Sequence, residues 1–152
     1  MSRRWMNRLV LAALGACVPS AAHAVNVLQI CSVNDISAGS WSGSGDVTGQ
    51  DQISIYNKDS DNYYITADTG GGEYDANDGN GHHISFQVKW NDGSGSGDVD
   101  MPHDSAVPAT LARRDSCGTL NATVKVKFLG GTLADAYAGT YSAVLNLTLT
   151  TR

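Results

Sequence analysis

Short runs of alternating apolar and polar residues dominate the chain and predict β-strands. The clearest run, 84–90, places on one face Ile84, Phe86, Val88 and Trp90. In 123–128 both lysines point to one side, and the inward residues are Val124, Val126 and Phe128. Further runs lie at 25–33, 52–56, 63–67 and 141–151. The last run aligns on one face Tyr141, Ala143, Leu145, Leu147 and Leu149, with Val144 breaking the polar face.

The connecting segments have the composition of turns. Gly, Asn, Asp and Ser cluster at 70–72, 77–81 and 91–97, where they supply positive φ angles and side chain–backbone turns. We expect 101–109, with its two prolines, to be a loop or an edge crossing, and 133–137 to form one helical turn. About six half-buried strands at these spacings predict an all-β, immunoglobulin-like β-sandwich. No internal repeat or second domain is evident, so 25–152 is expected to be a single domain.

Composition supports the all-β prediction and removes several classes of function. The 152 residues include 17 glycines and a single glutamate, Glu73, so strong helix formers are scarce. Fifteen acidic and ten basic residues give a net charge of −5, with no basic patch for nucleic acid or anionic lipid. A helix bundle, a P-loop enzyme and a DNA-binding domain are therefore disfavoured.

The first 24 residues have the pattern of a secretory signal peptide. Three arginines precede an apolar run at 9–16, and Ala22-His23-Ala24 is a small-x-small cleavage site. Cleavage after Ala24 leaves 128 residues with a net charge of 7 − 15 = −8, because all three of these arginines are removed. The pattern therefore predicts export.

Two other export routes fit parts of the same segment. Residues 14–17 resemble a lipoprotein box, in which Cys17 is lipidated and becomes the first mature residue. Residues 2–4 resemble a twin-arginine signal, although the continuation at 5–7 departs from the usual pattern.

Cysteine arithmetic predicts one disulfide. Removal of Cys17 with the signal peptide leaves an even pair, Cys31 and Cys117, in an oxidising compartment. A bridge between them stabilises the fold by roughly 4–5 kcal/mol in the chain-entropy description, less any strain. The alternative is two buried, unpaired thiols.

No group of residues supports acid–base or nucleophilic chemistry, so we predict a non-enzyme without a cofactor or metal. Residues 75–79 resemble a calcium loop, but the ligand spacing and the distal Glu are missing. The adjacent His82 and His83 point to opposite faces of a strand, so they cannot bind one metal together in the ordinary way. The alternative is a surface zinc site that they form with His103. The Ser-Gly repeats lack a nucleophile elbow, and a secreted hydrolase needs a triad that is not found. The two glycosylation sequons, 121–123 and 146–148, are interpreted as strand residues.

The two ends of the predicted domain carry a family resemblance. Cys117-Gly118-Thr119-Leu120 leads into a strand, and the chain ends in Gly139-Thr140-Tyr141-Ser142 followed by alternating leucines. With the 63–67 and 88–90 runs, this pattern resembles archaic chaperone–usher pilin subunits, the group that includes spore coat protein U domains.

The resemblance implies an immunoglobulin-like fold that lacks its last strand. The protein is then a structural subunit of a secreted surface pilus or coat. A periplasmic chaperone covers the open groove with a strand, an outer-membrane usher assembles the subunits, and a neighbouring subunit later supplies a donor strand. The candidate groove residues are Tyr141, Ala143, Leu145, Leu147, Leu149 and Arg152, whose carboxylate is the expected anchor of the chaperone.

The resemblance also makes the start of the mature chain a candidate donor strand, formed by Val25, Val27, Leu28 and Ile30. Only six residues precede Cys31 after cleavage at Ala24, about half of what a donor strand usually needs, whereas cleavage at Cys17 gives 14. The alternative is an ordinary first strand that pairs within its own domain.

A second class of function is a self-complete secreted sandwich that binds carbohydrate or calcium through its Asp/Gly loops. Trp41 and Trp90 are the candidate stacking platforms. The alternation around Trp90 favours a place in the core, whereas Trp41 lies in a Gly/Ser segment.

Overall fold

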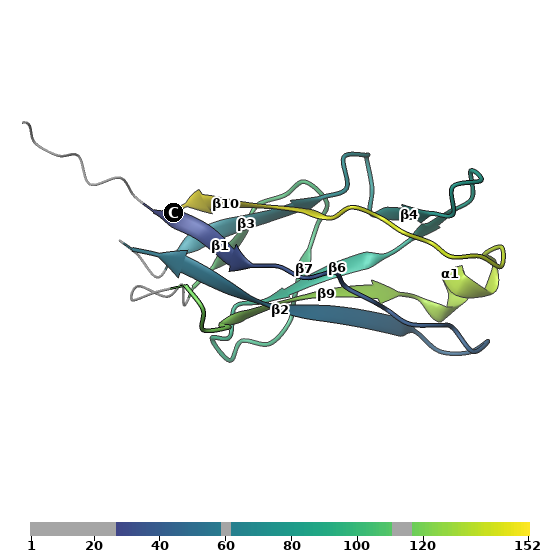
Figure 1. Cartoon of the computed structure of the whole chain (residues 1–152), viewed down its shortest axis with the longest axis horizontal. Helices are drawn as coiled ribbons and strands as arrows, with labels where there is room; N and C mark the ends of the chain where they lie inside the picture. The colour runs from purple at the N-terminus through teal and green to yellow at the C-terminus, as the bar shows by residue number, and fades with distance from the viewer. Residues whose placement is uncertain (1–26, 59–61, 111–116) are drawn as a thin grey trace, which may run out of the picture.

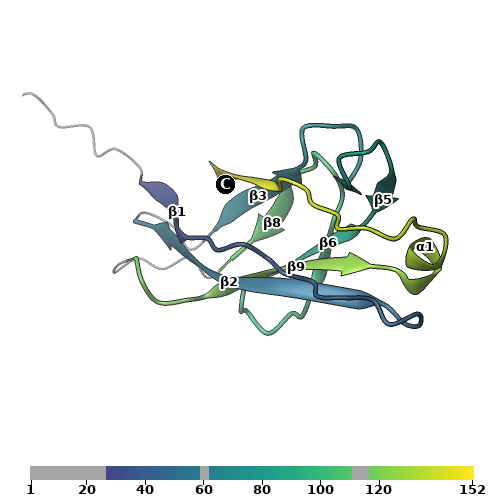
Figure 2. The ribbon, with the colours of Figure 1, turned by 45° about the vertical axis from the view of Figure 1, so that its right-hand side comes forward.

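The structure, a computed structural model, describes residues 27–58, 62–110 and 117–152. The predicted signal peptide with Cys17, and Val25, lie outside these residues. Figure 1 shows two layers of strands packed face to face, and Figure 2 shows the same layers from a second direction. The one helix among the described residues is α1 (Gly130–Ala134), a single short turn close to the predicted one.

The strands, in chain order, are β1 (Leu28–Ser32), β2 (Val47–Asn57), β3 (Tyr63–Asp68), β4 (Asp75–Asn77), β5 (His83–Ser85), β6 (Gln87–Asn91), β7 (Val99–Met101), β8 (Val107–Ala109), β9 (Ala122–Phe128) and β10 (Asn146–Thr151). One layer has the order β1-β2-β9-β6-β7 and the other β10-β3-β8, while β4 and β5 form a small separate hairpin. All pairs are antiparallel. The predicted all-β sandwich is confirmed.

The strand order matches an immunoglobulin sandwich. In the constant-type fold, strands A, B, E and D form one sheet and strands C, F and G form the other. Here β1, β2, β9 and β6 are neighbours in the order A-B-E-D, and β3 and β10 pair as C and F. Among the described residues no strand takes the position of G, next to β10 on the side away from β3.

The predicted 84–90 strand is divided between two sheets. Its first part, β5, pairs with β4, and its second part, β6, pairs with β7 and β9. At the division, the Phe86 N–H donates to the Tyr74 carbonyl (2.9 Å). The alternation persists across the break, because all four predicted inward residues are buried: Ile84, Phe86, Val88 and Trp90.

Two other segments differ from the sequence prediction. Residues 101–109, expected as a loop or edge crossing, contain the end of β7 and all of β8. Pro108 lies on β8, the edge strand of its sheet, which is where proline is tolerated. The last strand begins at Asn146 and not at Tyr141. The only strand-type pairing of the residues before it is an isolated bridge between Ser142 and Asn77.

The core lies between the two sheets and is built from the alternating positions of both. Its most enclosed side chains include Ile53, Ile55, Tyr63, Ile65, Val88, Trp90 and Val124. Tyr63 and Trp90 meet edge to face with ring centroids 6.4 Å apart, which joins β3 of one sheet to β6 of the other. Burial raises the pKa of the Tyr63 hydroxyl, so this side chain stays neutral in the core.

A glycine on β2 allows the segment that follows β1 to pack closely. A Cβ atom on Gly49 would stand 2.7 Å from both the Ser37 carbonyl oxygen and a methyl group of Ile36. The same segment is held by Asn34, whose backbone N–H donates to the Asp51 carboxylate (2.7 Å). The close approach explains why a strand interior carries a residue of low β-propensity.

Substitution of Gly49 tests this packing. Gly49→Ala is expected to destabilise the fold by about 1–3 kcal/mol, because the backbone at Ser37 must move away. Urea unfolding of the purified protein measures the change. The matched control is Gly131→Ala in α1, where a Cβ meets nothing within 4 Å and the stability should stay the same or rise. Equal losses in the two variants would contradict the close approach.

Candidate functional site

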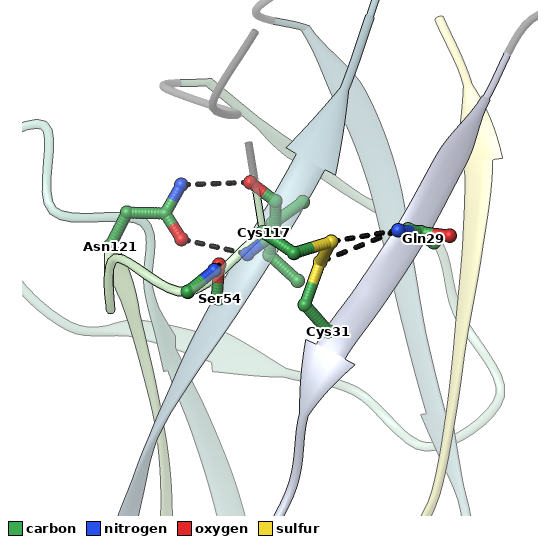
Figure 3. The surroundings of a disulfide bond; sticks show 7 residues. Gln29, Cys31, Ser54, Cys117 and Asn121 are labelled. Atoms are coloured by element: carbon green, nitrogen blue, oxygen red, sulfur yellow. Dashed lines mark hydrogen bonds between the residues drawn. A yellow bond between two sulfur atoms is a disulfide. The ribbon is translucent and has the colours of Figure 1, made fainter. Parts of the chain in front are cut away.

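The first strand is held within its own fold by hydrogen bonds and by the disulfide. β1 pairs with β2 from Leu28 opposite Asn57 to Ser32 opposite Ser54, and the Lys58 N–H donates to the Val27 carbonyl (3.1 Å). Cys31 is bonded to Cys117, with 5.5 Å between their Cα atoms, which confirms the predicted disulfide. Figure 3 shows Gln29 beside the bridge; its Nε2 donates to the Cys117 sulfur (2.7 Å).

The segment that carries Cys117 is fixed to the middle of β2. The Asn121 side chain pairs with the backbone of Ile55 as a further strand residue would: Oδ1 accepts from its N–H (2.7 Å), and Nδ2 donates to its carbonyl (3.0 Å) (Figure 3). The Gly118 N–H donates to the hydroxyl of the buried Ser54 (3.3 Å). These contacts place Cys117 where it meets β1. They also use the side-chain amide of Asn121, the group to which a glycan at the first sequon would be attached.

The last strand covers the edge of the other sheet. β10 pairs with β3 from Asn146 opposite Asp68 to Thr151 opposite Tyr63. The Asn146 amide donates to the Asp68 carboxylate (3.0 Å), and this bond, with one from the Gly70 N–H, holds the pKa of Asp68 below its usual range. Thr148 and Thr150 of β10 face outward, whereas the leucines at 145, 147 and 149 turn toward the core.

β1 and β10 meet along a line that we call the seam, defined by Leu28, Ile30, Leu145, Leu147 and Leu149. The two strands are in contact and run in opposite directions, so that the C-terminus lies beside the start of β1 (Figure 1). Each is the outermost strand of its sheet, and no hydrogen bond among the described residues joins them.

The seam side chains pack against the core but are only partly buried. Inward residues on the inner strands, in contrast, are buried, and Ile65, Val88 and Val124 are at most 2% exposed. The core is therefore less covered along the seam than elsewhere.

The opposite edges of the two sheets are protected. β7 has three residues and is followed by Pro102, and β8 contains Pro108. Beside β7, Asp98 pairs with Lys125 (2.7 Å) and Asp100 pairs with Lys89. Short strands, prolines and charged side chains are the usual means of blocking an edge against a further strand. The seam, in contrast, presents apolar side chains.

The structure brings some of the predicted groove residues together and separates others. The three leucines lie at the seam, and Tyr141 packs against the core ahead of β10, where its hydroxyl donates to the Tyr137 carbonyl (3.0 Å). Ala143 is exposed, because residues 143–145 lie outside any strand and do not pair with a neighbouring strand of a sheet. The Arg152 guanidinium lies 5.7 Å from the centre of the Tyr64 ring. A groove role for these residues stays a prediction.

Of the candidate donor residues, Leu28 and Ile30 belong to β1, and Val27 directly precedes it. They are paired within their own fold, the alternative that the sequence left open. Their use as a donor strand stays a prediction.

The candidate carbohydrate platforms are not exposed aromatic faces. Trp90 is 1% exposed, so its proposed role in stacking is wrong and its place is in the core. Trp41 is half-buried, and its indole N–H donates to the Gly45 carbonyl (3.0 Å), which ties it to its own loop.

The calcium-like segment is used to build a turn. Asp75 begins β4, while the Asp78 carboxylate accepts hydrogen bonds from the backbone N–H groups of Asn80 (2.8 Å) and His82 (3.2 Å). The His82 ring, 2.7 Å from the same carboxylate, holds the pKa of Asp78 well below its usual range and stacks on Tyr137. His103 accepts from the Thr69 N–H (3.2 Å). The part of the chain that the structure describes contains no group of three metal-ligating side chains arranged around one point.

Comparisons with known proteins bear on the fold. No protein-family model and no curated protein matches the sequence. A solved chain from the chaperone–tip adhesin complex of CFA/I fimbriae biogenesis aligns over 82% of this chain with a TM-score of 0.57 and 13% identity. What the two chains share is the fold. CfaE, the adhesive subunit of the CFA/I fimbria of enterotoxigenic Escherichia coli, aligns over 74% with a TM-score of 0.49 and 11% identity. This chain spans 41% and 38% of their respective lengths.

In the described ranges, no helix has both the length and the apolar character required to cross a bilayer.

Several residues that hold β1 and the Cys117 segment in place could not be recognised from the sequence pattern. Gln29 and Ser54 occupy polar positions of alternating strands, where any polar residue fits the pattern. Asn121 stood out only as the first residue of a sequon. Its position four residues after Cys117, directly before a strand, is the one signal that could have marked it, because Asn side chains commonly satisfy backbone groups at such ends.

Removal of the disulfide is expected to weaken the attachment of β1. Cys31→Ser with Cys117→Ser should lower the free energy of unfolding by roughly 4–5 kcal/mol, since the bridge closes a long loop. Urea unfolding measures the loss, and amide hydrogen exchange should show reduced protection in β1 before β9. Wild-type protein treated with a reductant is the control, and it should approach the double variant. Unchanged stability in both samples would contradict this role.

The two sequon asparagines allow a matched test of the Asn121 contacts. Asn121→Ala leaves the Ile55 backbone groups without their partners and is expected to cost about 1–3 kcal/mol. Asn146→Ala removes one exposed hydrogen bond to Asp68 and should cost less than about 1 kcal/mol. Thermal and urea unfolding compare the two variants. A larger loss for Asn146→Ala would show that Asn121 does not fix the Cys117 segment.

Proposed function

We propose that this protein is a structural, non-enzymatic subunit of a secreted surface pilus or coat, and that its seam accepts a strand from another polypeptide. One observation carries the proposal. The position beside β10, where strand G of an immunoglobulin sandwich lies, is empty among the described residues, and the leucines that strand would cover are only partly buried.

The physical basis is strand addition. An edge strand presents backbone N–H and C=O groups without partners, and β10 also presents apolar side chains at alternate positions. An extended segment with apolar residues at every second position would satisfy both, because its backbone pairs with β10 and its side chains cover Leu145, Leu147 and Leu149. Exposed edges of this kind favour aggregation, so the free subunit needs a partner soon after export.

The proposed partners follow from that need. A periplasmic chaperone covers the seam first, and a neighbouring subunit replaces it during assembly through an outer-membrane usher. The sequence resemblance to archaic chaperone–usher pilins supports this order, as does a fold shared with a chain from a chaperone–tip adhesin complex. The predicted signal peptide supports the passage through the periplasm to the cell surface.

A fused strand tests the proposal directly. An eight-residue strand of alternating Val and Thr, joined after Arg152 by a Gly/Ser linker, can fold back against β10 as an antiparallel neighbour. Covering the leucines should raise the melting temperature by at least about 5 °C and increase the soluble periplasmic yield. Calorimetry and fractionation measure the two effects.

The controls separate strand docking from tail length. A Gly/Ser tail of equal length should change neither quantity. In the fused protein, Leu149→Ser should remove part of the gain, whereas the outward Thr150→Ser should leave it intact. If the Val/Thr and Gly/Ser tails behave alike, the sandwich is complete without a further strand and the proposed function fails.

A further inference from the structure

We propose that the strand that fills the seam comes from a different polypeptide, and that copies of this chain do not polymerise with one another. The inference rests on the proposed function and adds the identity of the partner. It makes this protein an acceptor that ends an assembly and not a repeating subunit within it.

The first step is that every residue from Val27 onward up to the end of β1 is already committed. The Val27 carbonyl accepts a hydrogen bond from Lys58, and Leu28–Ser32 pairs with β2. Cys31 is covalently bonded to Cys117, so β1 stays tethered to the segment that leads into β9 while the disulfide is intact. Leu28 and Ile30 also cover part of the core. A copy that withdrew β1 as a donor would lose one side of its own seam.

The second step concerns the residues before Val27. Cleavage after Ala24 would leave only two residues, Val25 and Asn26, ahead of Val27, and two residues span at most about 7 Å in an extended chain. β10 has six residues, and a matching strand is therefore about 20 Å long. Two residues cannot cover the leucines of a neighbouring copy.

The lipoprotein alternative does not change the result. Cleavage at Cys17 would leave ten residues, 17–26, ahead of Val27, and their only branched aliphatic side chains are Val18 and Val25. Pro19 removes a backbone donor from the same segment. A donor for the seam needs bulky apolar residues at alternate positions, facing Leu145, Leu147 and Leu149, and this segment does not supply them.

The side chains of the seam indicate which length and residue pattern the donor strand from another polypeptide needs. It is an extended segment of about six residues with apolar side chains on one face. Its other face lies beside the outward threonines of β10, where Thr or Ser forms favourable cross-strand pairs. A charged donor is excluded on the inner face, because its charge would be buried against leucines without a partner.

The test compares three mature proteins with the disulfide intact. The first is the wild type. The second carries an extra copy of residues 25–30 joined upstream of Val25 by a Gly/Ser linker, so that one copy remains free while β1 stays in place. The third is identical to the second except that the apolar residues of the extra copy are Ser. Light scattering after size-exclusion chromatography measures the mass, and mass spectrometry verifies the mature N-terminus.

The inference predicts that the wild type and the Ser control form no discrete oligomers. The protein with the extra copy is expected to form a series of two, three and more subunits, and filling its seam with the Val/Thr tail after Arg152 should abolish that series. If the extra copy fails to oligomerise while the tail still stabilises the protein, the chain's own strand does not fit the seam, which also supports a foreign donor.

Discrete head-to-tail oligomers of the wild type would overturn the inference. If the Val/Thr tail stabilises the protein in that case, the proposed function stands and only the foreign origin of the donor is wrong. If the tail has no effect, the seam does not accept strands, and the proposed function and this inference fail together.

Discussion

The Cys31–Cys117 disulfide fixes the strand on which one side of the seam depends. β1 has only five residues, lies at the edge of its sheet and pairs with a single neighbour, so hydrogen bonding alone holds it weakly. The bridge ties it to the segment that leads into β9, and Asn121 fixes that segment to Ile55 of β2. A covalent bond across 86 positions and one amide side chain thus keep the N-terminal strand in its own sandwich.

The two edges of each sheet differ in whether a further strand can pair with them. At β7 and β8, short strands, prolines and ion pairs prevent the approach of a further strand. At the seam, alternating leucines and unpaired backbone groups lie beside the partly buried Leu28 and Ile30. The hydrophobic effect and backbone hydrogen bonding therefore favour the same event at the seam, which is the addition of an extended apolar segment.

Much of the fold could be predicted because alternation is a local signal. The inward sets of 84–90 and of the strand that became β9 are buried or largely so, and the leucines of the last run face the core. The short strands β4, β7 and β8 could not be predicted, since three residues show too little periodicity. The prediction that the last strand begins at Tyr141 was wrong for a different reason. Ala143 alternates in sequence but has no neighbouring strand to hold it.

The sequence by itself determined which side of each strand is buried, where the chain turns and which cysteines pair. These properties follow from side-chain spacing, turn chemistry and the count of thiols. Only the tertiary structure decided which strands are neighbours. Backbone hydrogen-bonding groups are nearly the same at every residue, so they do not specify the strand with which they pair. Thus the run near Val27 could have been a free arm or a first strand. In the structure this run pairs with β2 and lies in contact with β10, so its apolar side chains form one side of the seam.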